Sequence, residues 1–148
     1  MRPLVLLALL LTGCATVPAA PAPSPTPEPV VLLVKTETRG GLCLSGTTCE
    51  SSITVMSDGT WTRVVNGAER TGTLSGGRVA ALTNAVELTE LAAAPPFIGT
   101  CPMAYDGQEQ VLTWLQEGEP VTVASCEREY DPTDPLVVAS AELSAELA

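Results

Sequence analysis

The side chains that could carry covalent catalysis are few in this 148-residue chain. It contains no histidine, which excludes a serine hydrolase with histidine as its general base. A serine–lysine pair would need Lys35, the single lysine, which falls in the first expected strand. Two acidic pairs are present, Glu117 with Glu119 and Asp131 with Asp134. Both pairs fall in expected turns, where carboxylates are usually solvated, so we expect a protein without enzymatic activity.

The acidic loop EREYDPTDP is a candidate cation site, because clustered carboxylates supply the oxygen ligands that Ca²⁺ prefers. Its acids are Glu127, Glu129, Asp131 and Asp134. The structural alternative is that Asp134, directly before a proline, caps a helix while the other acids keep the surface soluble. We expect the structural role, with no metal and no cofactor, and leave weak calcium binding open.

The stretch Tyr105-Asp106-Gly107 is the candidate binding loop. Exposed loop residues on a rigid scaffold commonly carry binding. The structural alternative is a turn pinned by a disulfide, with the tyrosine half buried.

Five cysteines are present, so at least one of them cannot pair within the chain. If Cys14 is set apart, the remaining four are Cys43, Cys49, Cys101 and Cys126. Four cysteines permit three pairings, of which we favour Cys43 with Cys49 and Cys101 with Cys126. The first closes the short loop CLSGTTC, and the second ties an irregular loop to the end of a later strand. Without C-x-x-C spacing or histidine, a redox or metal centre is disfavoured.

Residues 1–13 are typical of a secretory signal peptide. Arg2 supplies a positive charge, and the eight apolar residues 4–11 would rise only about 12 Å as a helix, too little for a bilayer core of about 30 Å. The residues Leu11-Thr12-Gly13-Cys14 resemble the lipobox of bacterial lipoproteins. This resemblance implies cleavage before Cys14, which would be diacylated on sulfur and anchor the mature chain in a membrane. The alternative is an ordinary signal peptide that leaves Cys14 as a free thiol.

Residues 14–29 are expected to form a tether behind the lipidated cysteine. The segment ATVPAAPAPSPTPEP carries proline at alternate positions, which forbids a helix and favours an extended polyproline-type spacer. Fifteen residues at about 3.1 Å each reach roughly 45 Å. The folded domain, expected over residues 30–148, would then stand away from the membrane.

Charge and composition exclude some partners. Seven basic residues stand against 17 acidic ones, a formal net charge of -10. Nucleic acid is not expected as a partner, because phosphate binding needs clustered Lys and Arg.

Aromatic residues are 3% of the chain, so the core must consist mainly of Val, Leu, Ala and Ile. Disulfides would add stability to such a modest core.

The strand patterns predict two hairpin regions. Residues 30–38 read as a strand, and the turns Asp58-Gly59 and Asn66-Gly67 join residues 51–57, 61–65 and 69–74 as three consecutive antiparallel strands. A second hairpin is expected over residues 110–116 and 121–126.

Helical periodicity appears in two places. The first helix is expected over residues 75–93, with Ser75 as its N-cap and a Pro-Pro pair after its end. A last helix is expected to begin at Asp134-Pro135. The final turn of that helix carries Glu142 and Glu146, which oppose the helix dipole and predict a frayed end. The expected fold class is α+β, an antiparallel sheet of about five strands with two helices on one face, in the order βββαββα.

Residues 41–143 resemble small uncharacterised domains of secreted proteins and lipoproteins from GC-rich bacteria. The shared features are a cysteine-bearing loop, Gly-Thr-Leu before a V-A-A-L helix, the stretch G-T-C-P-x-A-Y-D-G-x-E and a closing V-x-x-C. The resemblance implies no activity. A looser similarity of layout, a hairpin before a helix and then a second hairpin, is to small protein inhibitors of thermolysin-like metallopeptidases.

Together these features predict a lipid-anchored, extracytoplasmic, non-enzymatic module of the cell envelope that binds another envelope protein. Membrane contact is expected through the N-terminal lipid alone. Two alternatives stay open: an inhibitor of an extracytoplasmic peptidase, and a carboxylate-dependent hydrolase.

Overall fold

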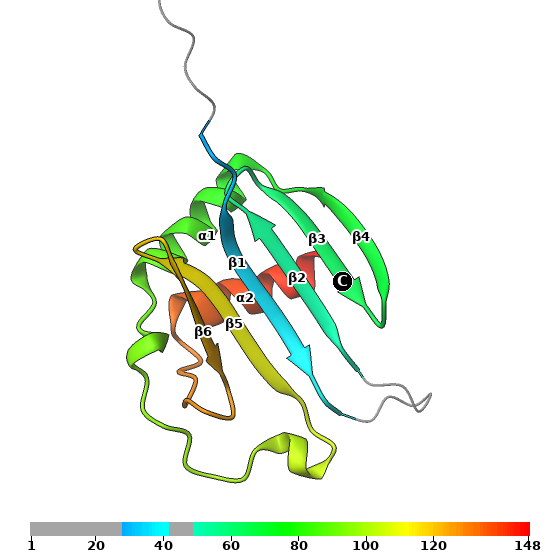
Figure 1. Ribbon diagram of the computed structural model, residues 1–148, viewed down its shortest axis with the longest axis vertical. Helices are drawn as coiled ribbons and strands as arrows, with labels where there is room; N and C mark the ends of the chain where they lie inside the picture. The colour runs from blue at the N-terminus through cyan, green and yellow to red at the C-terminus, as the bar shows by residue number, and fades with distance from the viewer. Residues whose placement is uncertain (1–27, 42–48) are drawn as a thin grey trace, which may run out of the picture.

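The computed structural model describes residues 28–41 and 49–148. These residues form one six-stranded antiparallel sheet, with strand order β4-β3-β2-β1-β5-β6, and two α-helices (Figure 1). The strands are β1 (Leu32–Arg39), β2 (Ser51–Met56), β3 (Thr60–Val65), β4 (Ala68–Thr73), β5 (Glu109–Gln116) and β6 (Glu119–Ala124). The helices are α1 (Gly76–Leu88) and α2 (Pro135–Glu146), and the short 3₁₀ helices η1 (Leu91–Ala93) and η2 (Pro102–Tyr105) lie between α1 and β5.

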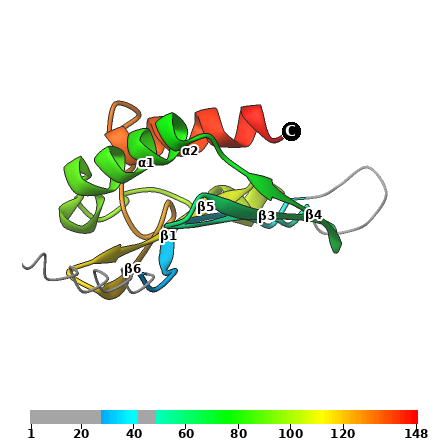
Figure 2. The same ribbon diagram turned by 90° about the horizontal axis from the view of Figure 1, so that it is seen from above.

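The α+β class is confirmed, and both helices cover the same face of the sheet (Figure 2). The expected count and order of strands are wrong, because the described residues form six strands in the order ββββαββα. The strand expected over residues 30–38 is present as β1, and it pairs with β2 on one side and with β5 on the other. This strand therefore joins the N-terminal strands and the C-terminal hairpin into a single sheet.

The alternation of β1 explains its central place. Val34 and Thr36 are buried on the helix side, whereas Lys35 between them and Glu37 after them are only partly buried. Val34 lies opposite Val55 of β2 and Trp114 of β5, and all three side chains are at most 1% exposed. This row forms the middle of the hydrophobic core. The apolar residues of β2 and β5 thus lie on the same helix-covered face of the sheet as Val34.

The helices complete the core with apolar side chains at helical spacing. Leu82 of α1, and Leu136 and Leu143 of α2, are fully buried against the sheet. Burial of each such side chain contributes about 1.5–3 kcal/mol relative to leaving it exposed. Among the described residues, no helix has the length and the apolar character needed to cross a bilayer.

Both helices begin at the side-chain caps that the sequence predicts. Ser75 accepts a hydrogen bond from the main-chain N–H of Arg78 at 3.3 Å. Asp134 accepts one from the N–H of Leu136 at 2.8 Å, with Pro135 as the first helical residue. These local patterns fix where each helix starts.

The expectation of a frayed C-terminus for α2 is wrong. The helix continues to Glu146, and Arg78 of α1 forms ion pairs with Glu142 (Nη1–Oε2 2.9 Å) and Glu146 (Nε–Oε2 3.1 Å). The second contact has the distance of an ion pair without hydrogen-bond geometry. The following residue, Leu147, is buried, and its carbonyl oxygen accepts a hydrogen bond from Arg63 of β3. Cations from two other elements therefore offset the unfavourable acids.

Candidate functional site

Residues 94–108 include the candidate binding stretch Tyr105-Asp106-Gly107, and for this reason we call the whole segment the binding loop. It connects η1 to β5 and runs along one end of the sheet (Figure 1). Three of its large apolar side chains are exposed, Ile98 at 94%, Met103 at 44% and Tyr105 at 77%. The alternative of a half-buried Tyr105 is therefore wrong. Single exposed apolar residues are ordinary, whereas large exposed apolar patches mark interaction sites, so three such residues on one loop make it the candidate interaction surface.

The binding loop is tied firmly to the segment that follows β6. The expected disulfide between Cys101 and Cys126 is present, with a Cα–Cα distance of 5.1 Å. Pro96 forms a β-bridge with Arg128, whose guanidinium donates a hydrogen bond to the carbonyl oxygen of Ala94 at 2.9 Å. The loop therefore holds its shape through a covalent bond and main-chain pairing together.

The turn at Asp106-Gly107 has a structural role of its own. Asp106 adopts the left-handed conformation (φ 62°), and the N–H of Gly107 donates to the carbonyl oxygen of Pro102 at 2.8 Å. A Cβ on Gly107 would lie 2.7 Å from that same oxygen, so this close approach requires glycine. Of the three residues singled out from the sequence, Tyr105 and Asp106 face solvent and Gly107 shapes the turn.

The binding loop also contacts the end of β1. A Cβ on Gly40 would lie 3.0 Å from Cγ of Met103 and 3.4 Å from the carbonyl oxygen of Gly107. Gly40 has a positive φ of 76°, which turns the chain away from β1 at this point. The methionine is thus held against backbone while part of its side chain stays exposed.

Two of the cysteine predictions concern residues outside the described ranges. Cys14 and Cys43 lie there, so lipidation and the pairing of Cys43 with Cys49 stay predictions, although Cys49 is itself disulfide-bonded. Within the described ranges, one group of three ligand-type residues has its ligand atoms within 4.8 Å of one another: Cys101, Glu109 and Cys126. The disulfide uses both sulfur atoms, so the carboxylate of Glu109 is the one metal ligand that this group could still offer.

The acids of the EREYDPTDP loop serve different purposes. Asp134 is 8% exposed, and its carboxylate accepts hydrogen bonds from Thr89 and from the N–H of Glu90 in addition to its capping bonds. Asp131 is exposed and accepts from the hydroxyl and the N–H of Thr133, at 2.7 and 2.8 Å. The hydroxyl bond, more than the N–H bond, lowers the pKa of this carboxyl. Glu127 and Glu129 are exposed. The capping role expected for Asp134 is confirmed.

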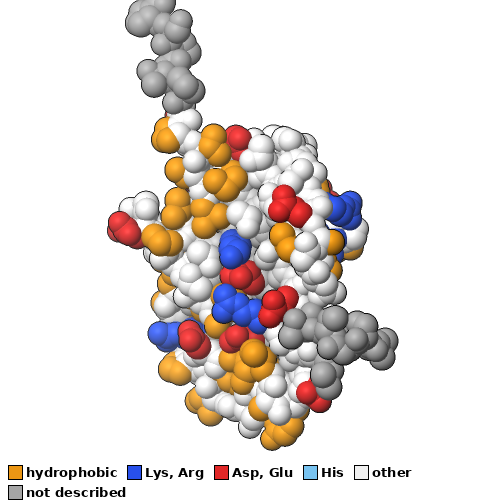
Figure 3. Space-filling model, turned by 45° about the vertical axis from the view of Figure 1, so that its right-hand side comes forward, with side chains coloured by type: hydrophobic (Ala, Val, Ile, Leu, Met, Phe, Trp, Pro, Cys, Tyr) orange, Lys and Arg blue, Asp and Glu red, His pale blue; other side chains and the backbone are white. Residues whose placement is uncertain are grey.

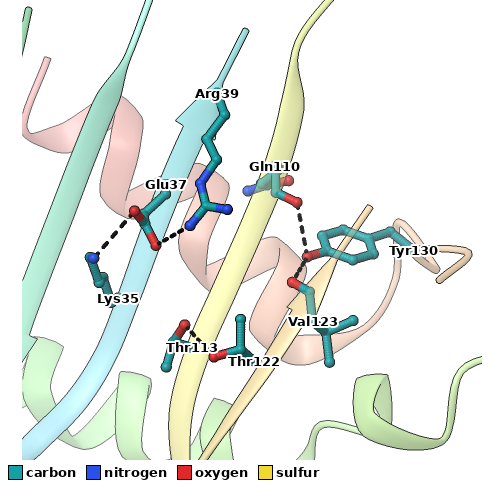
Figure 4. Close-up of polar contacts among 8 residues, drawn as sticks. All are labelled: Lys35, Glu37, Arg39, Gln110, Thr113, Thr122, Val123 and Tyr130. Carbon is teal, nitrogen blue, oxygen red and sulfur yellow. Dashed lines mark hydrogen bonds and ion pairs between the residues drawn. The ribbon is translucent and has the colours of Figure 1, made fainter. Parts of the chain in front are cut away.

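The helix-free face of the sheet carries a row of polar residues that crosses all six strands. The strand register places them side by side, in sheet order, as Thr122, Thr113, Lys35, Thr54, Thr62 and Thr71. The hydroxyls of Thr113 and Thr122 are 3.0 Å apart (Figure 4). Sequence reasoning missed this row because its members come from strands far apart in the chain. The sequence signal is a threonine between two apolar residues, as at Thr54 and Thr122.

Charges on the same face neutralise one another. Glu37 lies between Lys35 and Arg39 on β1, at 3.2 Å from each (Figure 4). Basic and acidic side chains gather in the middle of this surface in Figure 3. A hollow of about 560 Å³ lies beside them, lined in part by Arg39, Ser52 and Val64. Lys35 is therefore paired with the carboxylate of Glu37, and among the described residues it forms no bond to a serine.

Comparisons with known proteins add no relative to this picture. No protein-family model matches the chain. No curated protein matches its sequence. The resemblances to lipoprotein domains and to peptidase inhibitors therefore stay hypotheses, and the functional argument rests on the surfaces described above.

Proposed function

We propose that this protein is a lipid-anchored, extracytoplasmic module of the cell envelope that binds another envelope protein through the binding loop. The observation that carries the proposal is the exposure of Ile98, Met103 and Tyr105 on one loop braced by a disulfide. Tyrosine and methionine are enriched at protein interfaces. A braced loop also loses little conformational freedom on binding, so more of the contact energy remains as affinity.

The chemistry of the loop defines the partner surface. The exposed residues supply an aliphatic, a thioether and an aromatic contact, with the exposed Asp106 beside the tyrosine. The whole chain carries a formal charge of -10. A complementary partner therefore offers an apolar hollow with basic residues at its rim, since opposite charges speed association and fix orientation.

The membrane address in this proposal rests on the N-terminal sequence. Cys14 carries the lipid, and residues 15–29 form the spacer, whose length of roughly 45 Å lets the binding loop reach a partner beyond the headgroups. Support comes from the start of β1 at Leu32, close to the expected domain boundary at residue 30. Metabolic labelling with a fatty acid is expected to mark the wild type, and Cys14→Ser is expected to lose both the label and the membrane association.

A photo-cross-linking experiment tests the binding function. A photoreactive amino acid at position 105 of the full-length protein is expected to give one dominant protein adduct in cells that produce it. Ile98→Ser in the same chain should abolish the adduct. Val138→Ser is the matched control, because Val138 is 41% exposed on α2 and not on the binding loop. Equal adducts in the two variants would refute the loop as the binding surface.

The two alternatives give different results in enzyme assays. Inhibition of an extracytoplasmic metallopeptidase, lost in Ile98→Ser, would identify the partner as a peptidase. Turnover of a substrate by the purified wild type, abolished by substitution of a single carboxylate or serine, would instead contradict a non-enzymatic role.

A further inference from the structure

Within residues 28–41 and 49–148, no strand pairs with the outer edge of β4. The hairpin between β3 and β4 turns at Asn66-Gly67, both at positive φ (49° and 82°), which is the type I′ geometry of a two-residue turn. The closing pair, Val65 with Ala68, is hydrogen-bonded in such hairpins, and bonded pairs recur at every second residue. The N–H and C=O groups that point away from β3 are therefore those of Glu69, Thr71 and Thr73.

The opposite edge of the sheet is protected. Pro120 in β6 has no N–H to offer. The carbonyl oxygen of Ala124 already accepts hydrogen bonds from the N–H groups of Glu127 and Arg128, both at 3.0 Å. Natural proteins block sheet edges in this way to prevent association. In β4, by contrast, proline is absent and every residue except Gly72 is exposed.

Arg70 in β4 faces another cation across the strand pair. It lies directly opposite Arg63 of β3, and like charges in that position destabilise a strand pair. Within the described ranges no hydrogen bond or ion pair of Arg70 is present. Its side chain is exposed on the helix side of the sheet.

The next residue on that side, Gly72, leaves an aromatic ring accessible at the edge. A Cβ on Gly72 would lie 2.5 Å from a ring carbon of Trp61, so the indole of β3 lies across the glycine. Trp61 is only partly buried. A guanidinium that reached Gly72 from outside the sheet would meet this ring, a favourable cation–π contact.

We propose that β4 pairs with β4 of a second copy of this chain, antiparallel, about a two-fold axis at Thr71. In this register the unpaired groups of Glu69, Thr71 and Thr73 all gain partners, because Glu69 faces Thr73 of the other copy. Arg70 faces Gly72 of the other copy and contacts its Trp61, and the symmetry repeats the contact. The two sheets become one, and the threonine row continues across the interface.

The residues at the edge favour this register and this partner. A two-fold axis at Arg70 would place two arginines opposite each other, which is unfavourable. An arbitrary extended peptide could use the main-chain groups, but it would supply an arginine opposite Gly72 only by coincidence. The proposal rests on β4 alone and does not depend on the binding loop.

Thiol cross-linking of the full-length protein tests the proposal. In Thr71→Cys the two cysteines meet at the axis, with Cα atoms about 5.5 Å apart, so a short thiol–thiol cross-linker should give a covalent dimer. Thr54→Cys is the matched control, because it lies in the same threonine row on an inner strand and should stay monomeric. Equal cross-linking of both variants, or none of Thr71→Cys, would overturn the proposal.

Sedimentation velocity gives a second, independent measurement. The dissociation constant of the wild-type dimer is expected to lie below about 0.1 mM. Arg70→Glu should weaken the dimer at least tenfold while stabilising the monomer, because it replaces an Arg–Arg pair by an Arg–Glu pair. A merely structural role for Arg70 would change thermal stability and leave association unchanged. A wild type that stays monomeric, or that cross-links only to a different protein, contradicts pairing with a second copy.

Discussion

The hydroxyl of Thr89, directly after α1, donates a hydrogen bond at 2.9 Å to the carboxylate of Asp134, which caps α2. The same carboxylate accepts from the N–H of Glu90 at 3.0 Å. One buried side chain thus satisfies donors at the end of one helix and at the start of the other. The junction explains how a chain with few aromatic residues fixes its two helices side by side on the sheet.

Asp134→Ala should therefore be strongly destabilising. It removes a helix cap and leaves one buried and several partly buried donors without an acceptor, so we expect a loss of about 2–4 kcal/mol in the free energy of unfolding. Asp131→Ala is the control, because that carboxylate is exposed and bonds only to Thr133; its effect should stay near about 0.5 kcal/mol. Urea unfolding measures both, and similar losses would refute the linking role.

Tyr130 gives the protein a predictable alkaline sensitivity. Burial raises the pKa of its hydroxyl, which bonds to the carbonyl oxygens of Val123 and Gln110 at 2.7 and 3.2 Å (Figure 4). The unfolded chain then releases this proton at a lower pH than the folded one. The contribution of Tyr130 to the free energy of unfolding is therefore fully present below the unfolded pKa of about 10. It falls as the pH rises above that value.

Tyr130→Phe should flatten that decline while lowering stability at neutral pH by about 1 kcal/mol for the lost hydrogen bond. Tyr105→Phe is the matched control, since Tyr105 is 77% exposed and should leave the profile unchanged. Thermal unfolding of the three proteins between about pH 7 and about pH 11 measures the difference. An unchanged alkaline decline in Tyr130→Phe would show that another group causes it.

Arg78 should keep the last turn of α2 closed. Arg78→Met retains the apolar stem but removes the charge that Glu142 and Glu146 contact, so the turn should open more often. We expect faster hydrogen exchange of the amides at residues 145–147, equivalent to about 0.5–1 kcal/mol. Arg39→Met, on the helix-free face, is the control and should leave these amides unchanged. Identical protection in both variants would mean that the packing of Leu147 and its hydrogen bond to Arg63 hold the turn without Arg78.

Two glycines should respond in opposite directions to alanine. No neighbouring atom lies within 4 Å of a Cβ on Gly77, in the first turn of α1, so Gly77→Ala should stabilise the protein by about 0.5–1 kcal/mol. At Gly107 a Cβ would lie 2.6 Å from Cβ of Pro102, so Gly107→Ala should destabilise the protein and distort the binding loop. Thermal unfolding measures the first effect, and the cross-linking yield at position 105 reports the second. Stabilisation by Gly107→Ala would contradict the packing described for this turn.

Local patterns in the sequence predicted the parts of the fold that depend on neighbouring residues. Ser75 and Asp134 cap their helices, and Asn66-Gly67 forms a hairpin turn, because each acts within a few residues. The position of β1 could not be found in this way, since its pairing with β5 depends on competition among all strands. The fraying predicted for α2 failed for the same reason, because Arg78 lies on another helix.

The binding surface was predicted only in part. The motif around Tyr105 indicated a turn pinned by a disulfide, but the exposure of that side chain depends on how η2 packs against Gly40. The threonine row and the free edge of β4 are properties of the assembled sheet. They become visible only when the register is known.

The place of Lys35 in the threonine row has a practical consequence for labelling. It is the only lysine of the chain, and it lies near the middle of the helix-free face with its side chain 37% exposed. An amine-reactive dye would therefore modify the folded domain at one defined point. Any molecule that binds to this face would slow that reaction, so the rate of Lys35 modification reports whether the helix-free face is occupied.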